Sequence, residues 1–309
     1  MNFILYIRGG LGNQLFQYAT MRYLHSLHPG SVMYIDRRGY QNYKVRDFEL
    51  DSFKLIDKTR DYQESPMKYE LSRKGYHLYQ YLYQKATGWQ APMLGKMFQK
   101  QGLIYATIDY VLPQVLSESN NYLYGYFAKF EYIDSIREEL VGEVKLKHEM
   151  SDKAKLYSQH IAESICPVGV SVRYGKDYQS LGWPICQPAY YYSAIKKIHD
   201  KFGKCKFFIF CDVIDEVKSE GWFKDFDVEY VEGCSVPESF TLLKSCTHFV
   251  IPNSSFAVWA AYLSDNPFKI VYAPNYFYTE RYGHRYDRIM HFKGEKFLDY
   301  RTGSETEDI

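Results

Sequence analysis

Residues 166–178 read CPVGVSVRYGKDY, and this stretch sets the expectation for the fold. An apolar strand over residues 168–172 runs directly into Arg173, and a tyrosine, a glycine and a charged cluster follow. Open α/β sheets bind their ligands at the carboxyl ends of their strands. The planar, permanently charged guanidinium of Arg173 suits phosphate oxygens. A surface salt bridge at the strand end is the competing interpretation.

The alternation of strand and helix around this stretch continues through the second half of the chain. Such an alternation predicts a parallel, doubly wound sheet. We expect strands over residues 168–172, 206–211, 228–231, 249–251 and 269–272, and helices over 151–164, 188–199, 213–220, 237–245 and 256–264.

The first half opens with a similar unit. A strand over residues 3–7, a helix over 14–27 and a strand over 32–35 form a β–α–β opening. The elements expected after these are a helix over 61–86, strands over 103–107 and 122–126, and a helix over 129–140.

The helix expected over residues 61–86 carries a stripe made of Tyr76, Tyr79, Leu82 and Tyr83. We assign this stripe to the core or to a surface between domains. A charged, irregular stretch near residue 150 then separates the two halves. We therefore predict an N-terminal domain of residues 1–150 and a C-terminal domain of residues 151–309.

The composition excludes some classes of protein. Of 309 residues, 46% are hydrophobic and 24% are charged, as in an ordinary globular protein. Lys and Arg number 38 against 37 Asp and Glu, a net charge of +1, which argues against a dedicated nucleic-acid-binding protein. The 32 tyrosines suit sugar recognition, because tyrosine combines an apolar ring face with a hydroxyl, and a tyrosine-rich interface or a drift in base composition is the alternative.

The cysteines and the N-terminus predict a cytoplasmic protein. The 6 cysteines form no CxxC pair and no metal-ligand spacing, which indicates a reducing compartment and no structural zinc. The apolar part of the N-terminus is too short for a signal peptide. No segment reaches the roughly 18 apolar residues that a membrane span needs.

A glycine turn follows the first strand, where residues 9–14 read GGLGNQ. Backbone N–H groups in such a turn lie at the positive end of the helix dipole and suit a bound phosphate. A dinucleotide-binding fingerprint with Asp36 on the ribose fits less well, because Leu15 stands where that fingerprint has Gly or Ala. A structural turn without a ligand is the other alternative.

Two further predicted strands end in polar side chains. Asn253, Ser254 and Ser255 follow one of them at the start of a helix, where they either cap the helix or hold a pyrophosphate. Asp212 follows another, where it either accepts hydrogen bonds from a base or ribose or caps the next helix. Residues 225–227 read DFD among other charges, which we interpret as a solvated turn and not as a metal site.

Long blocks of the chain follow the order found in one enzyme family. Residues 9–19 read GGLGNQLFQYA and residues 253–263 read NSSFAVWAAYL. Between them lie GYF at 125–127, IREEL at 136–140 and FFIFCD at 207–212. Together these blocks resemble the bacterial α-1,2-fucosyltransferases of glycosyltransferase family 11.

The resemblance implies a GT-B-like α/β fold, with two Rossmann-like doubly wound domains and a cleft between them. The N-terminal domain would take the acceptor and the C-terminal domain the donor. The reaction would be inverting transfer of L-fucose from GDP-fucose to the 2-hydroxyl of a galactoside in a surface glycan or oligosaccharide, without a metal or other cofactor. The implied partners are the nucleotide sugar and the glycan acceptor, with peripheral association with a membrane or a glycan-assembly machinery.

The resemblance also assigns roles to residues. Arg173 would neutralise charge on the leaving β-phosphate, and Asp177 is the candidate base for the acceptor hydroxyl. The expected donor-binding residues are Gly10, Gly12, Asn13, Ser171, Arg173, Lys176, Asp212, Asn253, Ser254 and Ser255. No residue is assigned to a metal.

The chain departs from the family at its HxRRGDY-type motif. Ser171 replaces the histidine, Tyr174 replaces the second arginine, and Lys176 is inserted. In related fucosyltransferases the histidine helps to hold guanine, so these changes bear on the donor. Two alternatives therefore stay open: the same fold with a different nucleotide-sugar donor, and a non-catalytic protein that binds a nucleotide or a sugar.

Overall fold

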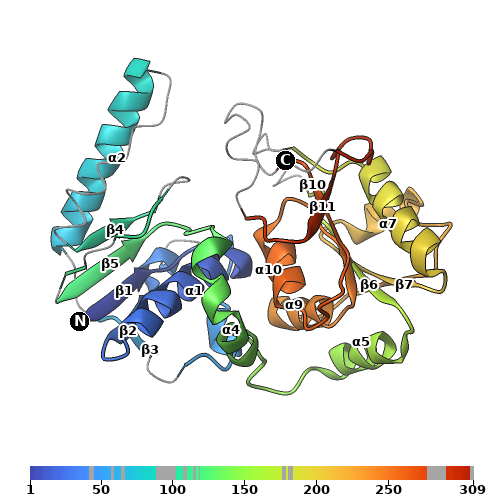
Figure 1. The fold of residues 1–309 in the computed structure, drawn as a ribbon, viewed down its shortest axis with the longest axis horizontal. Coiled ribbons are helices and arrows are strands. Elements are labelled where there is room, and N and C mark those ends of the chain that lie inside the picture. The colour runs from blue at the N-terminus through green and yellow to red at the C-terminus, as the bar shows by residue number, and fades with distance from the viewer. Residues whose placement is uncertain are drawn as a thin grey trace. The chain divides into compact units, whose positions relative to one another are not determined.

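The computed structural model describes residues 1–41, 45–56, 59–63, 67–87, 102–106, 110–113, 116–117, 119–175, 179, 184–276 and 290–306 (Figure 1). The chain divides into two compact units. Unit 1 comprises Met1–Phe48 and Leu55–Ile136, and unit 2 comprises Glu49–Lys54 and Arg137–Ile309.

Unit 1 is built on a parallel sheet with the strand order β3-β2-β1-β5-β4. The strands are β1 (Asn2–Tyr6), β2 (Val32–Asp36), β3 (Thr59–Asp61), β4 (Leu103–Tyr105) and β5 (Asn120–Tyr124). The helices are α1 (Leu11–Leu27), α2 (Met67–Thr87) and the 3-10 turns η1 (Arg37–Tyr40), η3 (Phe130–Tyr132) and η4 (Asp134–Ile136).

The two faces of the unit 1 sheet differ in character. Helix α1 packs against β1 and β2 on one face. On the other face, Ile4 and Leu103 form a cluster with Tyr122 and Tyr124 of β5 and Tyr69 of α2. Tyrosine rings thus take the place that aliphatic side chains usually fill.

Unit 2 is a second parallel sheet, with the strand order β11-β10-β9-β6-β7-β8. Its strands are β6 (Pro167–Val172), β7 (Lys206–Cys211), β8 (Val228–Tyr230), β9 (His248–Val250), β10 (Val271–Pro274) and β11 (Glu295–Leu298). Its helices are α4 (Arg137–Glu143), α5 (Asp152–Glu163), α7 (Pro188–Phe202), α8 (Ile214–Ser219), α9 (Val236–Lys244) and α10 (Ser255–Leu263), and the 3-10 turn η2 (Leu50–Ser52) belongs to this unit.

The direction of strand addition in unit 2 reverses beside its first strand. From β6 the chain adds β7 and β8 on one side, and then β9, β10 and β11 on the other. Every residue of β6 is buried, as expected for a central strand of a parallel sheet. The predicted doubly wound α/β architecture is confirmed. The predicted cleft between the two domains stays a prediction.

Local sequence signals start and end several helices of unit 2. The Ser235 side chain accepts a hydrogen bond from the backbone N–H of Glu238, and the Glu238 carboxylate accepts one from the backbone N–H of Ser235, which forms a capping box for α9. The Ser151 side chain caps α5 by accepting a hydrogen bond from the backbone N–H of Ala154. Helix α7 ends at Gly203, whose φ of 75° favours glycine.

The structural division of the chain differs from the boundary predicted near residue 150. The contacts separate the units between Ile136 and Arg137. The Arg137 guanidinium donates to the carbonyl oxygen of Tyr262 at 2.9 and 3.1 Å and to that of Ser264 at 2.8 Å, which ties the start of α4 to the end of α10. This tertiary contact has no local signal in the sequence.

Two properties of the described part bear on its chemistry. No helix there is long and apolar enough to cross a membrane. The same residues contain no group of three or more His, Cys, Asp or Glu side chains that could hold a metal ion.

Candidate functional site

The reversal of strand order between β6 and β9 marks the place where an open α/β sheet binds its ligand. Because all these strands are parallel, their carboxyl ends meet at one edge of the sheet. Arg173 follows β6, Asp212 follows β7, and Asn253 to Ser255 lie between β9 and α10. The structure thus brings Arg173, Asp212 and residues 253–255 to one edge of the sheet.

Asp212 organises the loop that follows β6. Its carboxylate forms an ion pair with the Arg173 guanidinium. It also accepts hydrogen bonds from the backbone N–H groups of Tyr174, at 2.9 Å, and Gly175, at 3.1 Å. The side chains of Arg173 and Asp212 are 21% and 20% exposed, so solvent can reach the pair while the hydrogen bonds of Asp212 fix its position.

This arrangement answers one question that the sequence left open. Helix α8 starts at Ile214, and its N-cap residue Val213 makes no side-chain capping bond. Asp212 therefore orients Arg173 and the loop. Arg173 does form a salt bridge, as the competing interpretation predicted. This salt bridge lies at the carboxyl edge of the sheet, where open α/β sheets bind ligands.

Aromatic side chains contact the loop that follows β6. The backbone N–H of Arg173 donates to the Tyr191 hydroxyl at 3.4 Å. Tyr191 is fully buried in α7, and this burial raises the pKa of its hydroxyl well above the usual value. Tyr174 packs edge-on against Trp222, with ring centroids 5.1 Å apart. The backbone at the end of β6 is therefore fixed before any ligand arrives.

The N-terminus of α10 supplies the second part of the site. Ser254 occupies the N-cap position, but its side chain makes no capping hydrogen bond. Asn253 is buried, and its amide donates to the Pro184 carbonyl oxygen at 2.6 Å, which joins this turn to the segment before α7. The first N–H groups of a helix attract anions, and α10 has 9 residues.

The remaining unit 2 candidates are placed differently. Ser171 is buried within β6 and lies beside Phe210 of β7 in the sheet register. Lys176 and Asp177 lie outside the described residues.

In unit 1, the glycine turn is held by two buried glutamines. The Gln14 amide donates to the carbonyl oxygens of Gly9, at 2.9 Å, and Asp47, at 2.8 Å. The Gln17 amide donates to the carbonyl oxygens of Arg8, at 2.7 Å, and Asn13, at 2.8 Å. These bonds favour the structural role of the turn, and donor contacts from Gly10, Gly12 and Asn13 stay a prediction. This use of Gln14 and Gln17 was not predicted from the sequence.

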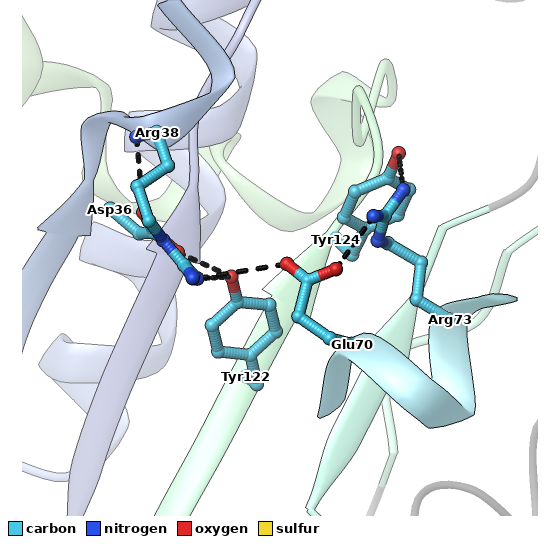
Figure 2. Close-up of polar contacts among 6 residues, drawn as sticks. All are labelled: Asp36, Arg38, Glu70, Arg73, Tyr122 and Tyr124. Carbon is cyan, nitrogen blue, oxygen red and sulfur yellow. Dashed lines mark hydrogen bonds and ion pairs between the residues drawn. The ribbon is translucent and has the colours of Figure 1, made fainter. Parts of the chain in front are cut away.

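A polar network lies at the end of β2, next to α2 (Figure 2). Asp36 is completely buried and accepts hydrogen bonds from Arg38 at 2.8 and 2.5 Å and from the Tyr122 hydroxyl at 2.5 Å. Burial and the neighbouring Asp36 carboxylate raise the pKa of Tyr122. Because its oxygens are engaged within the sheet, Asp36 is not available to a ribose.

Helix α2 extends this network along the sheet (Figure 2). Arg73 forms an ion pair with Glu70 at 2.7 Å and donates to the Tyr124 hydroxyl at 3.5 Å. Arg8 lies over the rings of Tyr124, at 5.4 Å, and Tyr126, at 5.0 Å. The carboxyl edge of the unit 1 sheet thus carries a surface of tyrosine rings and guanidinium groups. The high tyrosine count suited a sugar-binding surface, but the sequence did not show which residues form this surface.

The DFD segment lies at the opposite edge of the unit 2 sheet from Arg173. Asp225, Phe226 and Asp227 precede β8 and line a cavity together with Lys206 at the start of β7. This is the amino edge of the sheet, whereas Arg173 lies at the carboxyl edge. The segment therefore shares no ligand with Arg173.

Comparisons with known proteins place the chain in a family. The family model described as glycosyl transferase family 11 matches residues 3–288, and the chain belongs to this family. It is 26% identical to an alpha-1,2-colitosyltransferase of Escherichia coli over 87% of this chain and 89% of that protein. It is 25% identical to the O-antigen biosynthesis glycosyltransferase WbnK of Escherichia coli over 87% of this chain and 92% of that protein.

A solved structure has the same fold. The crystal structure of the fucosyltransferase NodZ from Bradyrhizobium superposes with a TM-score of 0.56 and 17% identity, over 87% of this chain and 95% of that chain. The chain is therefore a family 11 glycosyltransferase with the GT-B type of architecture.

Proposed function

We propose that this family 11 glycosyltransferase moves L-fucose from GDP-fucose to the 2-hydroxyl of a galactoside in a surface glycan or oligosaccharide. The observation that carries the proposal is the Arg173–Asp212 pair at the reversal point of a doubly wound sheet, at the same edge as the N-terminus of α10. A diphosphate is the ligand chemistry that suits a guanidinium and a helix N-terminus at one edge of a sheet. The α-1,2 linkage in the name of the E. coli relative supports the 2-hydroxyl.

In the proposed reaction, the acceptor oxygen attacks the anomeric carbon of fucose as the bond from that carbon to the phosphate oxygen breaks. The configuration inverts, GDP leaves, and the acceptor hydroxyl loses its proton. Negative charge grows on the β-phosphate in the transition state. Arg173, held by Asp212, and the α10 N-terminus would stabilise that charge, and one such group is worth about 10²–10³ in rate.

We also propose roles in the reaction for other residues of unit 2. Charge stabilisation by protein groups would make a metal unnecessary. Asp177 would take the acceptor proton, Lys176 would add a point charge near the phosphates, and Ser171 would lie near the base. Asn253, Ser254 and Ser255 would contact the diphosphate.

The acceptor is proposed to bind unit 1. Tyr124 and Tyr126, with Arg8 over their rings, provide apolar faces and polar donors on one surface. Aromatic rings of this kind stack on the faces of sugar rings while hydroxyl and guanidinium groups bond to the sugar hydroxyls. This surface would orient a galactoside.

A second candidate donor is supported by the relative named as a colitosyltransferase. Colitose is L-fucose without the 3-hydroxyl, so the two donors differ by one oxygen. The changed residues Ser171 and Tyr174 lie at the predicted donor site and are the features of this chain most relevant to that choice.

The test uses purified protein with GDP-fucose, GDP-colitose, GDP-mannose or UDP sugars, a panel of β-galactosides, and EDTA in parallel reactions. Mass spectrometry would detect the added sugar, and linkage analysis would identify the acceptor hydroxyl. We expect a deoxyhexose at the 2-position, unaffected by EDTA. Transfer only from GDP-colitose would select the second candidate. GDP binding without turnover on any acceptor would instead support a non-catalytic binding protein, and loss of transfer with EDTA would contradict the metal-free mechanism.

A further inference from the structure

Helix α2 exposes an apolar stripe along one face. Met67, Leu71, Leu78, Tyr81 and Leu82 are between 54% and 69% exposed. With 3.6 residues per turn, their spacing places all of them on the same side of the helix. Scattered apolar residues are ordinary on a protein surface, whereas a contiguous patch marks an interaction site.

The opposite face of α2 packs on the sheet through tyrosines. Tyr69 stacks on Tyr122 with ring centroids 5.0 Å apart, and Tyr76 packs on Tyr105 at 4.1 Å. Figure 1 shows α2 starting beside β4 and β5 and continuing past them. The helix thus buries Tyr69 and Tyr76 against the sheet and exposes its leucines, which is the reverse of an ordinary surface helix.

The charge along the stripe indicates what covers it. Lys74 and Lys85 lie on the same side of the helix as the leucines, and both are exposed. No acidic residue occurs between Leu71 and Thr87. Glu70, at the start of the helix, is paired with Arg73 at 2.7 Å and lies 3.7 Å from Arg38.

An anionic lipid surface complements this pattern. Leucine and methionine insert among acyl chains, tyrosine lies at the interface, and lysine extends its ammonium group to lipid phosphates. A second copy of the helix fits less well, because it would bring more lysines to the stripe and no carboxylate to pair with them. Helix α2 does not meet the requirements of a membrane-spanning segment, so it would lie in the interface.

We propose that the outward face of α2 docks the protein on an anionic lipid bilayer. Met67, Leu71, Leu78 and Leu82 enter the headgroup region, while Lys74 and Lys85 contact acidic headgroups. This docking is independent of the donor and acceptor chemistry proposed above, because it uses a face of α2 that faces away from the sheet.

The experiment is vesicle flotation of the full chain with phosphatidylcholine vesicles that contain or lack phosphatidylglycerol. We expect binding to the anionic vesicles that weakens as salt is raised. The double substitution Leu78→Gln with Leu82→Gln should weaken this binding at least tenfold. The double substitution Lys74→Gln with Lys85→Gln should weaken vesicle binding about tenfold or more, since each basic residue near an anionic surface adds to the binding free energy.

The matched control is Ile165→Gln with Phe268→Gln, which removes two apolar side chains that are 85% and 86% exposed in unit 2. This control should bind anionic vesicles like the wild type. Circular dichroism would verify that each variant is folded. No binding of the wild type to anionic vesicles at low salt would overturn the proposal. Light scattering that shows a dimer, lost in the leucine variant, would also overturn it in favour of a second copy.

Discussion

The two units place an aspartate at equivalent positions and use it in different ways. In each, the second strand of the β–α–β opening ends in Asp: Asp36 at the end of β2 and Asp212 directly after β7. Asp36 is completely buried and bonds to Arg38 and to Tyr122 of β5. Asp212 is 20% exposed and holds Arg173 at the reversal point of the sheet.

The difference shows how one residue type serves stability in one unit and ligand binding in the other. A carboxylate with no exposure must have all its bonds satisfied by the protein, so it contributes to folding and leaves nothing for a ligand. A partly exposed carboxylate that orients an arginine fixes the direction of a charge that a ligand can reach. Substitutions of Arg173, Asp36 and Asp212 separate these two uses.

The largest effect is expected for Arg173→Ala. If Arg173 stabilises the leaving diphosphate, kcat for sugar transfer should fall by about 10²–10³. Because the side chain is partly exposed, the melting temperature should change little. Steady-state kinetics and thermal unfolding of the same preparation measure both. Near-normal activity in a folded variant would remove Arg173 from the mechanism.

The counterpart in unit 1 is Asp36→Ala. Removing this buried acceptor leaves Arg38 and the Tyr122 hydroxyl without their partner, and breaking a buried pair costs about 3–5 kcal/mol. We expect about the lower value, because Arg38 is 30% exposed. Chemical denaturation measures the free energy of unfolding. A loss below about 1 kcal/mol would show that the network is not structural.

A smaller effect is expected for Asp212→Asn, which keeps an acceptor oxygen but removes the charge. Misplaced catalytic groups lose rate steeply, so we expect kcat to fall about tenfold or more through the position of Arg173. The unfolding free energy should fall by less than about 1 kcal/mol, as for other partly exposed ion pairs. A variant that loses stability but keeps kcat would assign Asp212 the role that Asp36 has in unit 1.

The smallest effect concerns the acid stability of unit 2. Burial would raise the pKa of Glu238, but hydrogen bonds from the backbone N–H groups of Ser151 and Ser235 outweigh it and lower the pKa to about 2. Because the folded pKa lies below the unfolded one, Glu238 stabilises the fold above its ordinary pKa of 4.5, and this stabilisation is lost as the pH falls toward 2.

Denaturation of the wild type and Glu238→Gln across this pH range measures the contribution. The two curves should differ near neutral pH and converge in acid. The hydrogen bonds of Glu238 go to Ser151 and Ser235, so activity per folded molecule should be unchanged. Curves that stay parallel down to pH 2 would contradict the assignment.

The sequence predicted those elements whose signal is local. The apolar runs of β6 and β7 identified central strands, and the start of α5 next to Ser151 was located, whereas α1 starts at Leu11, three residues before the predicted start at residue 14. Strand β3 was missed, because its three residues, TRD, have no apolar pattern. The helix expected over residues 129–140 is instead two 3-10 turns followed by α4, which starts at Arg137.

The missing parts of the site depend on contacts between distant segments. Arg173 and Asp212 were both predicted as site residues. The sequence did not predict that Asp212, after β7, forms an ion pair with Arg173, after the neighbouring strand β6. For α2, the predicted stripe was partly wrong: Tyr76 is buried, but Leu82 is 54% exposed. Periodicity locates the faces of a helix, yet only the sheet beneath it determines that tyrosines face inward.

Binding of the donor phosphates by unit 2 is tested most directly by calorimetry of GDP binding to the wild type, Arg173→Ala and Arg8→Ala. Arg8 is the matched arginine, because it also follows the first strand of its unit. We expect Arg173→Ala to weaken GDP binding by about tenfold or more, because a charged contact to phosphate is lost, while Arg8→Ala leaves it unchanged. Unchanged binding by Arg173→Ala, or its loss in Arg8→Ala alone, would contradict the assignment of the donor phosphates to unit 2.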